Sequence, residues 1–373
     1  MAVEPRCKYF GVCGGCCTQH LEYDLQLSNK RKLFARAIKV SEDFVEVFSD
    51  EEYGYRNRMD FVFHRNGLGL REKGKWWKVV NIDNCAIANN KLNFLLKEIK
   101  DFFVDCDFFD LKEKVGTFRY AVIRTPQDDS SISFVLNEDS KKLTEAIDKI
   151  KEFAKISSAK NIVVTYVPSK TDHSTSSEFF VVKGSDMLEE SYLGKTFHYS
   201  VQGFFQNNHE MAEKMVSETK KTLENYHTSD SGLVDLYGGV GGFGITNSDK
   251  FKELIIVEND KNCIDAAKKN IERNNLTHAR AYAMDAMRLL KVDLPEKLFI
   301  VTDPPRSGMH PKAIKAVNEL DPEVIVYISC NVLQLGKELG RFKNYKLKSA
   351  KLFDLFPQTN HCEGFVELVR KEE

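Results

Sequence analysis

The stretch Asp235-Leu-Tyr-Gly-Gly-Val-Gly-Gly-Phe-Gly244 decides the fold. Its glycines are spaced Gly239-x-Gly241-x-x-Gly244, and an acid, Glu258, ends the next apolar segment about 20 residues later. This spacing is typical of a loop between a strand and a helix that binds a nucleotide or nucleoside cofactor. A glycine-rich turn without a ligand is the alternative reading.

The segments around this loop alternate between apolar strands and helices. Such a rhythm predicts a mostly parallel sheet covered on both faces, a doubly wound α/β domain of seven strands. The last two strands lack a long helix between them and suit an antiparallel pair at the sheet edge. The predicted strands are 233–237, 254–258, 279–284, 298–302, 324–329, 346–355 and 365–370, and the predicted helices are 210–226, 261–275, 311–319 and 333–342.

The chain before residue 200 has a different character. Short strands there are joined by turns, one at Asn66-Gly67, and interrupted by charged helices, which predicts an α+β domain with one antiparallel sheet and helices on one face. We therefore expect two domains, 1–200 and 201–373, with the helix 23–40 packing on the second. The expected strands are 59–64, 68–72, 76–82, 117–125, 131–137, 161–168 and 178–184, and the other helices are 92–103 and 141–154.

Composition restricts the function further. The 373 residues include 54 Lys and Arg against 55 Asp and Glu, a net charge of −1, so any nucleic-acid binding must use a local patch. We find no apolar run long enough to span a membrane and no signal peptide, and we expect a cytoplasmic monomer that does not bind membranes. In a reducing compartment the nine Cys do not indicate disulfides.

Polar residues follow every predicted parallel strand at its carboxyl end, where ligands bind in such sheets. Besides the glycine loop and Glu258, these are Asp285, Asp303-Pro-Pro-Arg306 and Ser329-Cys330-Asn331. Asp285 suits an adenine amino group, and a rigid Pro-Pro turn can hold a polar side chain against a flat substrate. These features favour S-adenosylmethionine over NAD.

Together the motifs resemble the RNA 5-methyluridine methyltransferases. The resemblance rests on Asp235–Gly244, Glu258, Asp303–Arg306, Ser329–Asn331 and Asn360-His-Cys-Glu363, on Phe204-Phe-Gln-Asn207 before the domain, and on the cysteines at the start of the chain. It covers nearly the whole chain in family order. Gly238 stands where the family usually has Cys, and Val332 where Pro is common. We also expect an extra N-terminal barrel of some members to be missing.

The resemblance implies a class I methyltransferase domain that transfers a methyl group from S-adenosylmethionine to C5 of uridine. Cys330 is the implied nucleophile, which adds to C6 of uracil, and Glu363 is the implied base for the C5 proton. Asp303, Phe204 and Arg306 are the implied substrate contacts. The expected cofactor contacts are Gln206, Tyr237, Gly242, Glu258, Asp285 and Asp303.

The N-terminal cysteines indicate a metal site. Cys13-x2-Cys16 suits zinc or iron, since four thiolates satisfy either. Cys7 and the distant Cys85 complete an asymmetric pattern that, with the resemblance, favours a [4Fe–4S] cluster over zinc. Its expected role is structural or RNA-positioning.

The RNA partner is less visible. The first half mixes cations with aromatics, as suits phosphate contact and base stacking, but a solvated sheet face is an equal alternative. We favour the T-loop uridine (U54) of tRNA over large-subunit (23S) rRNA. More distant alternatives are an amine methyltransferase, an NAD-binding oxidoreductase and a non-catalytic iron–sulfur RNA-binding protein. The mixed segments are 55–58, Arg65, 71–73, 75–78 and 119–120.

Overall fold

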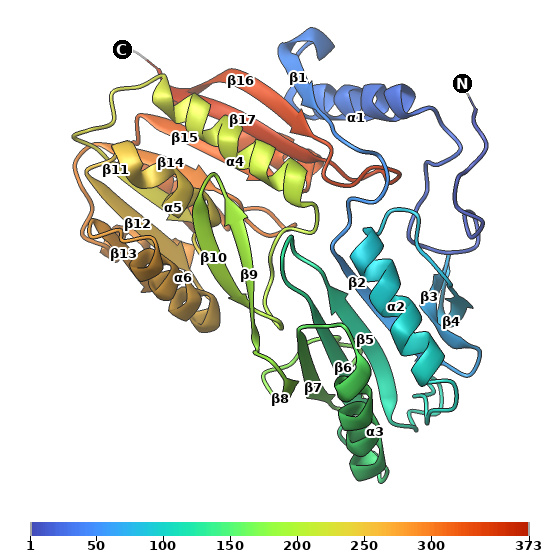
Figure 1. Cartoon of the computed structure of the whole chain (residues 1–373). Helices are drawn as coiled ribbons and strands as arrows, with labels where there is room; N and C mark the ends of the chain where they lie inside the picture. The colour runs from blue at the N-terminus through green and yellow to red at the C-terminus, as the bar shows by residue number, and fades with distance from the viewer. Residues whose placement is uncertain (1, 372–373) are drawn as a thin grey trace.

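Two large sheets organise residues 2–371, the part of the chain described by this computed structural model. An eight-stranded sheet carries the second half of the chain and a seven-stranded sheet carries the first, with a two-stranded hairpin between them (Figure 1). None of the helices in these residues is long and apolar enough to cross a bilayer.

The eight-stranded sheet is built on the predicted parallel strands. The strand β17 runs antiparallel to both of its neighbours, and the other paired strands are parallel. The central strands β11, β14 and β15 are buried along their whole length, which explains their near-continuous apolar sequences. In sheet order the strands are β1 (Val45–Phe48), β16 (Tyr345–Phe353), β17 (Glu363–Arg370), β15 (Val324–Ser329), β14 (Leu298–Thr302), β11 (Gly232–Leu236), β12 (Glu253–Glu258) and β13 (Ala279–Ala283).

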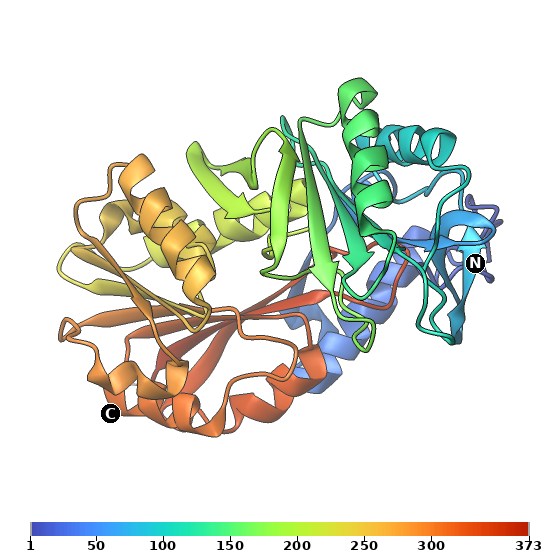
Figure 2. The same cartoon turned by 90° about the horizontal axis from the view of Figure 1, so that it is seen from below.

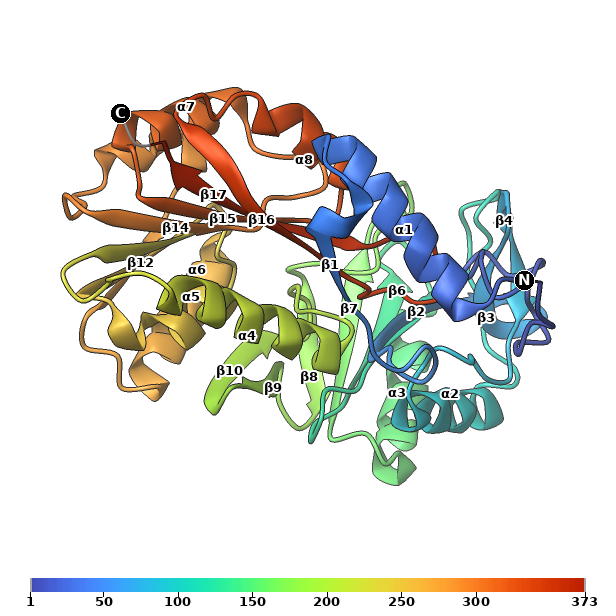
Figure 3. The ribbon, with the colours of Figure 1, turned by 90° about the horizontal axis from the view of Figure 1, so that it is seen from above.

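Helices cover both faces of this sheet, as predicted (Figure 3). One face packs against α4 (His209–Glu224), α5 (Gly242–Asn247) and α6 (Lys261–Arg273). The other packs against α1 (Tyr23–Ile38), α7 (Pro311–Leu320) and α8 (Val332–Leu339). Short 3₁₀ turns η1 (Glu42–Phe44), η2 (Ser248–Lys250) and η3 (Ala286–Lys291) complete the connections.

All seven strands predicted for the second half are present, but the sheet has an eighth strand and the predicted sheet edge is wrong. The last two strands are antiparallel as expected, but β1 from the first half pairs in parallel with β16 and takes the edge position. The four residues of β1 are too few to show the alternating hydrophobic pattern of a strand. They are positioned by α1, whose buried Phe34 and Ala35 belong to the same core as α8. The expected packing of this helix on the second domain is thus observed.

A buried ion pair attaches α1 to the loop between β16 and β17. Lys30 Nζ lies 2.6 Å from Asp354 Oδ1 and donates to the carbonyl of Phe356 at 3.2 Å, and Tyr23 donates its hydroxyl to Asp354 Oδ2. Lys30 and Asp354 are almost fully buried. This loop leads into Glu363, so α1 supports the segment that carries a predicted catalytic residue.

The seven-stranded sheet has one face covered by helices, as predicted. The core on that face includes Leu92 and Leu96 of α2 (Asn90–Phe102) and Ile150 and Phe153 of α3 (Leu143–Ile156). One pair, β6 with β7, is parallel because α3 crosses over between them. In sheet order the strands are β4 (Lys75–Asn81), β3 (Gly67–Glu72), β2 (Arg58–His64), β5 (Phe118–Arg124), β6 (Ser131–Asn137), β7 (Asn161–Val167) and β8 (Phe179–Lys183).

A hairpin of β9 (Met187–Tyr192) and β10 (Lys195–Ser200) lies between the two sheets (Figure 2). These two strands were not predicted from the sequence. Its strand β10 attaches to α6, where the amide of His198 donates to Asn270 Oδ1 at 2.8 Å and that of Thr196 donates to Asn274 Oδ1 at 3.1 Å. Residues just before 200 therefore contact the second half, and the domain boundary at 200 stays a prediction.

Candidate active site

The glycine loop after β11 closes on a buried carboxylate. Asp235 Oδ2 accepts a hydrogen bond from the amide of Gly244 at 2.7 Å. A Cβ at Gly244 would lie 2.9 Å from the side chain of Asp235 and 2.8 Å from Leu254, and Gly241 has φ +93°. The loop therefore requires glycine at both positions. Burial raises the pKa of Asp235 to about 7, although the amide of Gly244 opposes the shift.

A cavity beside this loop brings together most of the predicted cofactor residues. Gln206, Tyr237, Gly242 and Asp303 line it, and so does Phe204, whose side chain is 61% exposed. Four other lining residues were missed, because side chains on a helix and a hairpin carry no motif; they are Tyr192 of β9 and Ala212, Met215 and Val216 of α4. The remaining lining residues lie within the two quoted motifs and are Phe205, Gly238, Gly239, Val240 and Phe243.

Glu258 and Asp285 do not line that cavity but lie close to Tyr237. Glu258 accepts hydrogen bonds from the amides of Gly239, at 3.2 Å, and of Asn259, at 2.7 Å. Asp285 caps η3. Burial, and then the charges of Asp285 and Glu258 among others, raises the pKa of Tyr237 to about 12.

The thiol of Cys330 and the carboxyls of Asp303 and Glu363 lie close together at the ends of β14, β15 and β17. In the antiparallel register Ser329 is opposite Gly364, which brings Cys330 beside Glu363. Burial, and then the charges of Glu363 and Asp303, raises the pKa of the Cys330 thiol to about 11, and Arg306 opposes the shift. The two predicted catalytic residues, 33 positions apart in sequence, are thus neighbours.

Glu363, which is buried, and Asp303, which is half-buried, form a pair of neighbouring carboxyls. Burial and then the charge of Asp303 raise the pKa of Glu363 well above its ordinary value. Burial and then the charge of Asp235 raise the pKa of Asp303 to about 7. Neither side chain hydrogen-bonds to any residue between 2 and 371, so both carboxyls are available to a bound molecule. Paired carboxyls with raised pKa values are a common feature of sites that move protons.

Asn331 joins the two loops that carry these groups. Its Nδ2 donates to the carbonyl of Arg306 at 3.0 Å, and its Oδ1 accepts from the amide of Gln334 at 3.2 Å, which caps α8. Val332 then occupies the first helical position, where proline is favoured in general. The cap formed by Asn331 therefore fixes the turn after Cys330 in the absence of proline.

The loop after Asp303 is also held by a buried acid. Glu338 of α8 accepts from the amide of Met309 at 3.2 Å and from Gln334 Nε2 at 2.7 Å, and Tyr327 donates its hydroxyl to it. A Cβ at Gly308, which has φ +81°, would lie 2.1 Å from Glu338. No motif indicates this support, because an isolated acid on a helix usually lies in solvent.

The four predicted metal-binding cysteines converge. Cys7, Cys13, Cys16 and Cys85 line one cavity, together with apolar side chains such as Met59. Burial, and secondarily the charges of the other three cysteines, raises the pKa of Cys16 to about 12. In the described residues no three His, Cys, Asp or Glu side chains are arranged to hold a metal ion.

The predicted RNA-binding segments are only in part accessible. Arg119 is 2% exposed and donates to the carbonyl of Pro168, and Tyr55 is also buried. Their use as surface contacts is therefore wrong. Trp76 and Trp77 on the edge strand β4 are 58% and 38% exposed and stay candidates.

Fold and site define a class I S-adenosylmethionine-dependent methyltransferase. Residues 22–371 match the model of one family, described as tRNA (Uracil-5-)-methyltransferase. The chain belongs to this family, which sets aside the amine methyltransferase, oxidoreductase and binding-only readings.

Named relatives and one solved structure resemble almost the whole chain. The tRNA (uracil(54)-C(5))-methyltransferase of Pyrococcus furiosus is 31% identical over 97% of this chain and 84% of the relative. The enzyme of the same name from Pyrococcus abyssi is 29% identical over 99% of this chain and 87% of the relative. The crystal structure of the P. abyssi enzyme in complex with S-adenosyl-L-homocysteine has a TM-score of 0.80, with 96% of this chain and 86% of that chain covered.

Proposed function

We propose that this protein transfers the methyl group of S-adenosylmethionine to C5 of uridine 54 in the T-loop of tRNA. The reaction is that of the family, and the position of the uridine is the one in the names of the Pyrococcus relatives. The observation that carries the proposal is the meeting of Cys330, Glu363 and Asp303 beside the cofactor cavity.

Cys330 is the proposed nucleophile. C5 of uracil is too weak a nucleophile for a sulfonium methyl group until a thiolate adds to C6 and turns the ring into an enolate. The raised pKa of the Cys330 thiol means that the thiol must lose its proton to solvent before the thiolate adds, which leaves the carboxylate of Glu363 free for the later step. The bound S-adenosylmethionine supplies the electrophilic methyl group.

Glu363 is the proposed base for the second half of the reaction. After methylation C5 carries both a proton and a methyl group. The carboxylate removes that proton, C5=C6 reforms and the thiolate of Cys330 leaves. A carboxyl whose pKa is raised by burial and by Asp303 is a stronger base than an ordinary glutamate once it is ionised.

The substrate residues suit an extruded base. The proposed role of Asp303 is to accept a hydrogen bond from uracil N3–H, which requires its ionised form and hence a pH near or above 7. The exposed ring of Phe204 is available to stack on the base, and Arg306 lies near Cys330. A uridine in a loop costs less to extrude than one in a duplex.

The cofactor is proposed to bind between the glycine loop and the aromatic wall of the cavity. Gln206, Tyr237 and Gly242 would contact it directly. Glu258 holds the amide of Gly239, and Asp285 lies near the hydroxyl of Tyr237, so both are proposed to recognise the nucleoside end.

The four N-terminal cysteines are proposed to bind a [4Fe–4S] cluster. A single zinc ion requires four sulfur atoms about 3.8 Å apart, as follows from a Zn–S distance of about 2.3 Å. The four thiols instead share one cavity and have the three-plus-one spacing in sequence, which supports a cluster that takes each thiolate on a separate iron. The cluster would join the N-terminal loop, through Cys7, Cys13 and Cys16, to Cys85 before α2.

Metal content tests this assignment. Protein purified without oxygen should contain iron and sulfide and absorb visible light. The variant Cys13→Ser should lose the iron, the sulfide and the absorbance. The matched control is Cys17→Ser, because Cys17 does not line the cavity. Stoichiometric zinc in colourless protein would overturn the cluster.

Labelled S-adenosylmethionine tests the function. An unmodified tRNA transcript should accept label as 5-methyluridine, and the same transcript with cytidine at position 54 should not. Label in a 23S rRNA transcript and none in tRNA would favour the alternative substrate. We further propose that the protein acts in the cytoplasm as a monomer, in line with nine cysteines that form no disulfide.

A further inference from the structure

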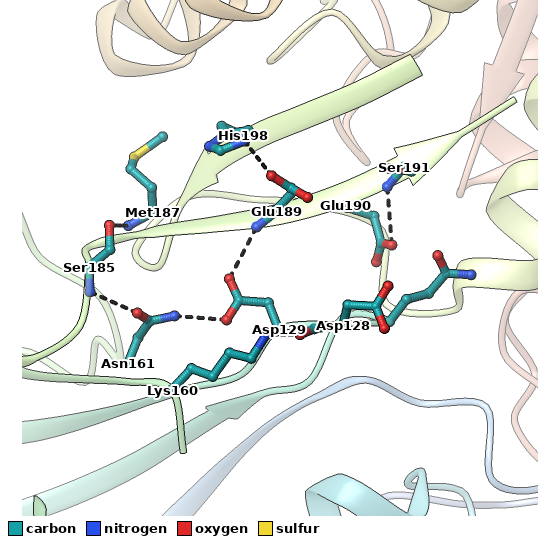
Figure 4. A pocket seen from close by; sticks show the side chains of 11 residues that line it. Asp128, Asp129, Lys160, Asn161, Ser185, Met187, Glu189, Glu190, Ser191 and His198 are labelled. Carbon is teal, nitrogen blue, oxygen red and sulfur yellow. Dashed lines mark hydrogen bonds and ion pairs between the residues drawn. The ribbon is translucent and has the colours of Figure 1, made fainter. Parts of the chain in front are cut away.

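A second cavity, separate from the cofactor cavity, lies beside the hairpin β9–β10 (Figure 4). It has a volume of about 370 Å³. The loop before β6, the start of β7 and the hairpin all contribute to its wall. The lining residues are Gln127, Asp128, Asp129, Lys160, Asn161, Ser185, Met187, Glu189, Glu190, Ser191 and His198.

The wall of this cavity is acidic. Its four carboxylates face one lysine, Lys160, whose Nζ donates to the backbone carbonyl of Asp128, and one histidine, His198. His198 Nε2 lies 2.8 Å from Glu189, and Asp129 accepts hydrogen bonds from Ser130 and Asn161. The carboxylates of Glu189 and Asp129 are therefore already paired with other groups of the protein. The side chain of Asp128 is exposed and makes no hydrogen bond or ion pair within residues 2–371, although it interacts electrostatically with Lys91.

Glu190 is the unusual member, because it is 3% exposed and half of its carboxylate lacks a partner. Its Oε1 accepts from the amide of Ser191 at 3.3 Å and lies 3.1 Å from His209 Nδ1. Its Oε2 has no hydrogen bond. In Figure 4 the carboxylate points from β9 toward the loop that carries Asp128. Buried carboxylate oxygens normally have a donor, so the cavity lacks one.

An organic cation suits this cavity better than a metal ion or RNA. Among residues 2–371 no group of three or more His, Cys, Asp or Glu side chains is arranged to hold a metal ion. The four carboxylates of the wall would repel the phosphates of RNA. Several carboxylates in one cavity suit a flexible organic molecule with two or more separated positive charges.

We propose that this acidic cavity binds a linear polyamine. One ammonium group donates to Glu190 Oε2 and a second pairs with Asp128. The site is independent of the methyl transfer, because none of these residues lines the cofactor cavity. Glu190 contacts His209, which stacks on Tyr192 of the cofactor cavity at 5.4 Å between ring centroids.

Calorimetric titration of the RNA-free full chain with spermidine tests the proposal at constant ionic strength. We expect one saturable site whose Kd rises at least tenfold in Asp128→Asn and in Glu190→Gln. The control Glu145→Gln removes an exposed carboxylate from α3, away from the cavity, and should leave the Kd unchanged. Butylamine, which has a single charge, should bind at least tenfold more weakly than spermidine.

Three results would overturn the site. They are no saturable binding to the parent chain, equal binding by Asp128→Asn and the control, or equal displacement by Mg²⁺ at matched ionic strength, which would indicate a diffuse ion atmosphere. Asp128 is exposed, so its variant stays informative even if Glu190→Gln fails to fold.

Discussion

Replacement of Glu363 by glutamine should separate the two halves of the proposed reaction. Glutamine has the shape of glutamate and leaves the backbone pairing of residue 363 with Phe353 unchanged, but its amide cannot accept the C5 proton. Removal of its negative charge also lowers the pKa of the Cys330 thiol, because that charge is one of the causes of the rise to about 11. Addition and methylation should therefore continue while release stops.

The expected magnitude is large. Loss of a general base slows turnover about 10²- to 10⁴-fold, or about 3–5 kcal/mol in activation free energy. With unmodified tRNA and labelled S-adenosylmethionine, the variant should give one equivalent of label in a protein–RNA adduct that survives a denaturing gel. Glu363→Asp, which keeps a carboxylate, should accumulate less, and the double variant with Cys330→Ala none. Normal turnover by Glu363→Gln would refute the assignment of the base.

Three further predictions concern stability and the cofactor loop. The pKa of Asp235 is raised to about 7 in the folded chain, so the unfolded chain loses the carboxyl proton at a lower pH and the stability of the fold decreases as pH rises from about 4 to 7. Asp235→Asn should remove up to about 4 kcal/mol of this decrease. The measurement is the difference in melting temperature between pH 5 and pH 8, which should be smaller in the variant. Lys30→Met leaves the buried Asp354 unpaired and should lower the free energy of unfolding, measured in denaturant, by about 3–5 kcal/mol. The double variant with Asp354→Leu should recover most of this loss. Equal losses in the single and double variants would contradict a buried ion pair. Gly244→Ala forces its Cβ against Asp235 and Leu254 and should weaken S-adenosylmethionine binding at least tenfold by calorimetry, while Gly340→Ala, which meets no atom within 4 Å, should bind normally.

The sequence predicted the central part of the fold well because the physical signals there are strong. The strands 298–302 and 324–329 were predicted to the residue, since buried parallel strands are continuously apolar and end in polar residues. The helix 311–320 was also found, as Pro311 marks its first turn. Elements held by tertiary contacts were missed: β1 depends on pairing with β16, and the hairpin β9–β10 on hydrogen bonds to α6.

The candidate site was predicted where its residues belong to recognisable motifs. Cys330, Glu363 and Asp303 carry recognisable motifs, and the register of β15 with β17 brings the first two together. The roles of Asn331 and Glu338 depend on which loops lie beside α8, and one sequence does not reveal this. Gly238, a departure from the family pattern, has a reason in the packing: a Cβ there would lie 2.8 Å from Ile256.

The most direct test of the account is the mass of the complex formed with tRNA that carries 5-fluorouridine at position 54. Fluorine replaces the C5 proton that Glu363 must remove, so the reaction should stop after methyl transfer with the RNA still attached. In the presence of S-adenosylmethionine we expect a stable adduct that includes the transferred methyl group, and peptide mapping should place the attachment at Cys330. Attachment at another cysteine, such as the neighbouring Cys362, or label in the RNA without any adduct would contradict the account.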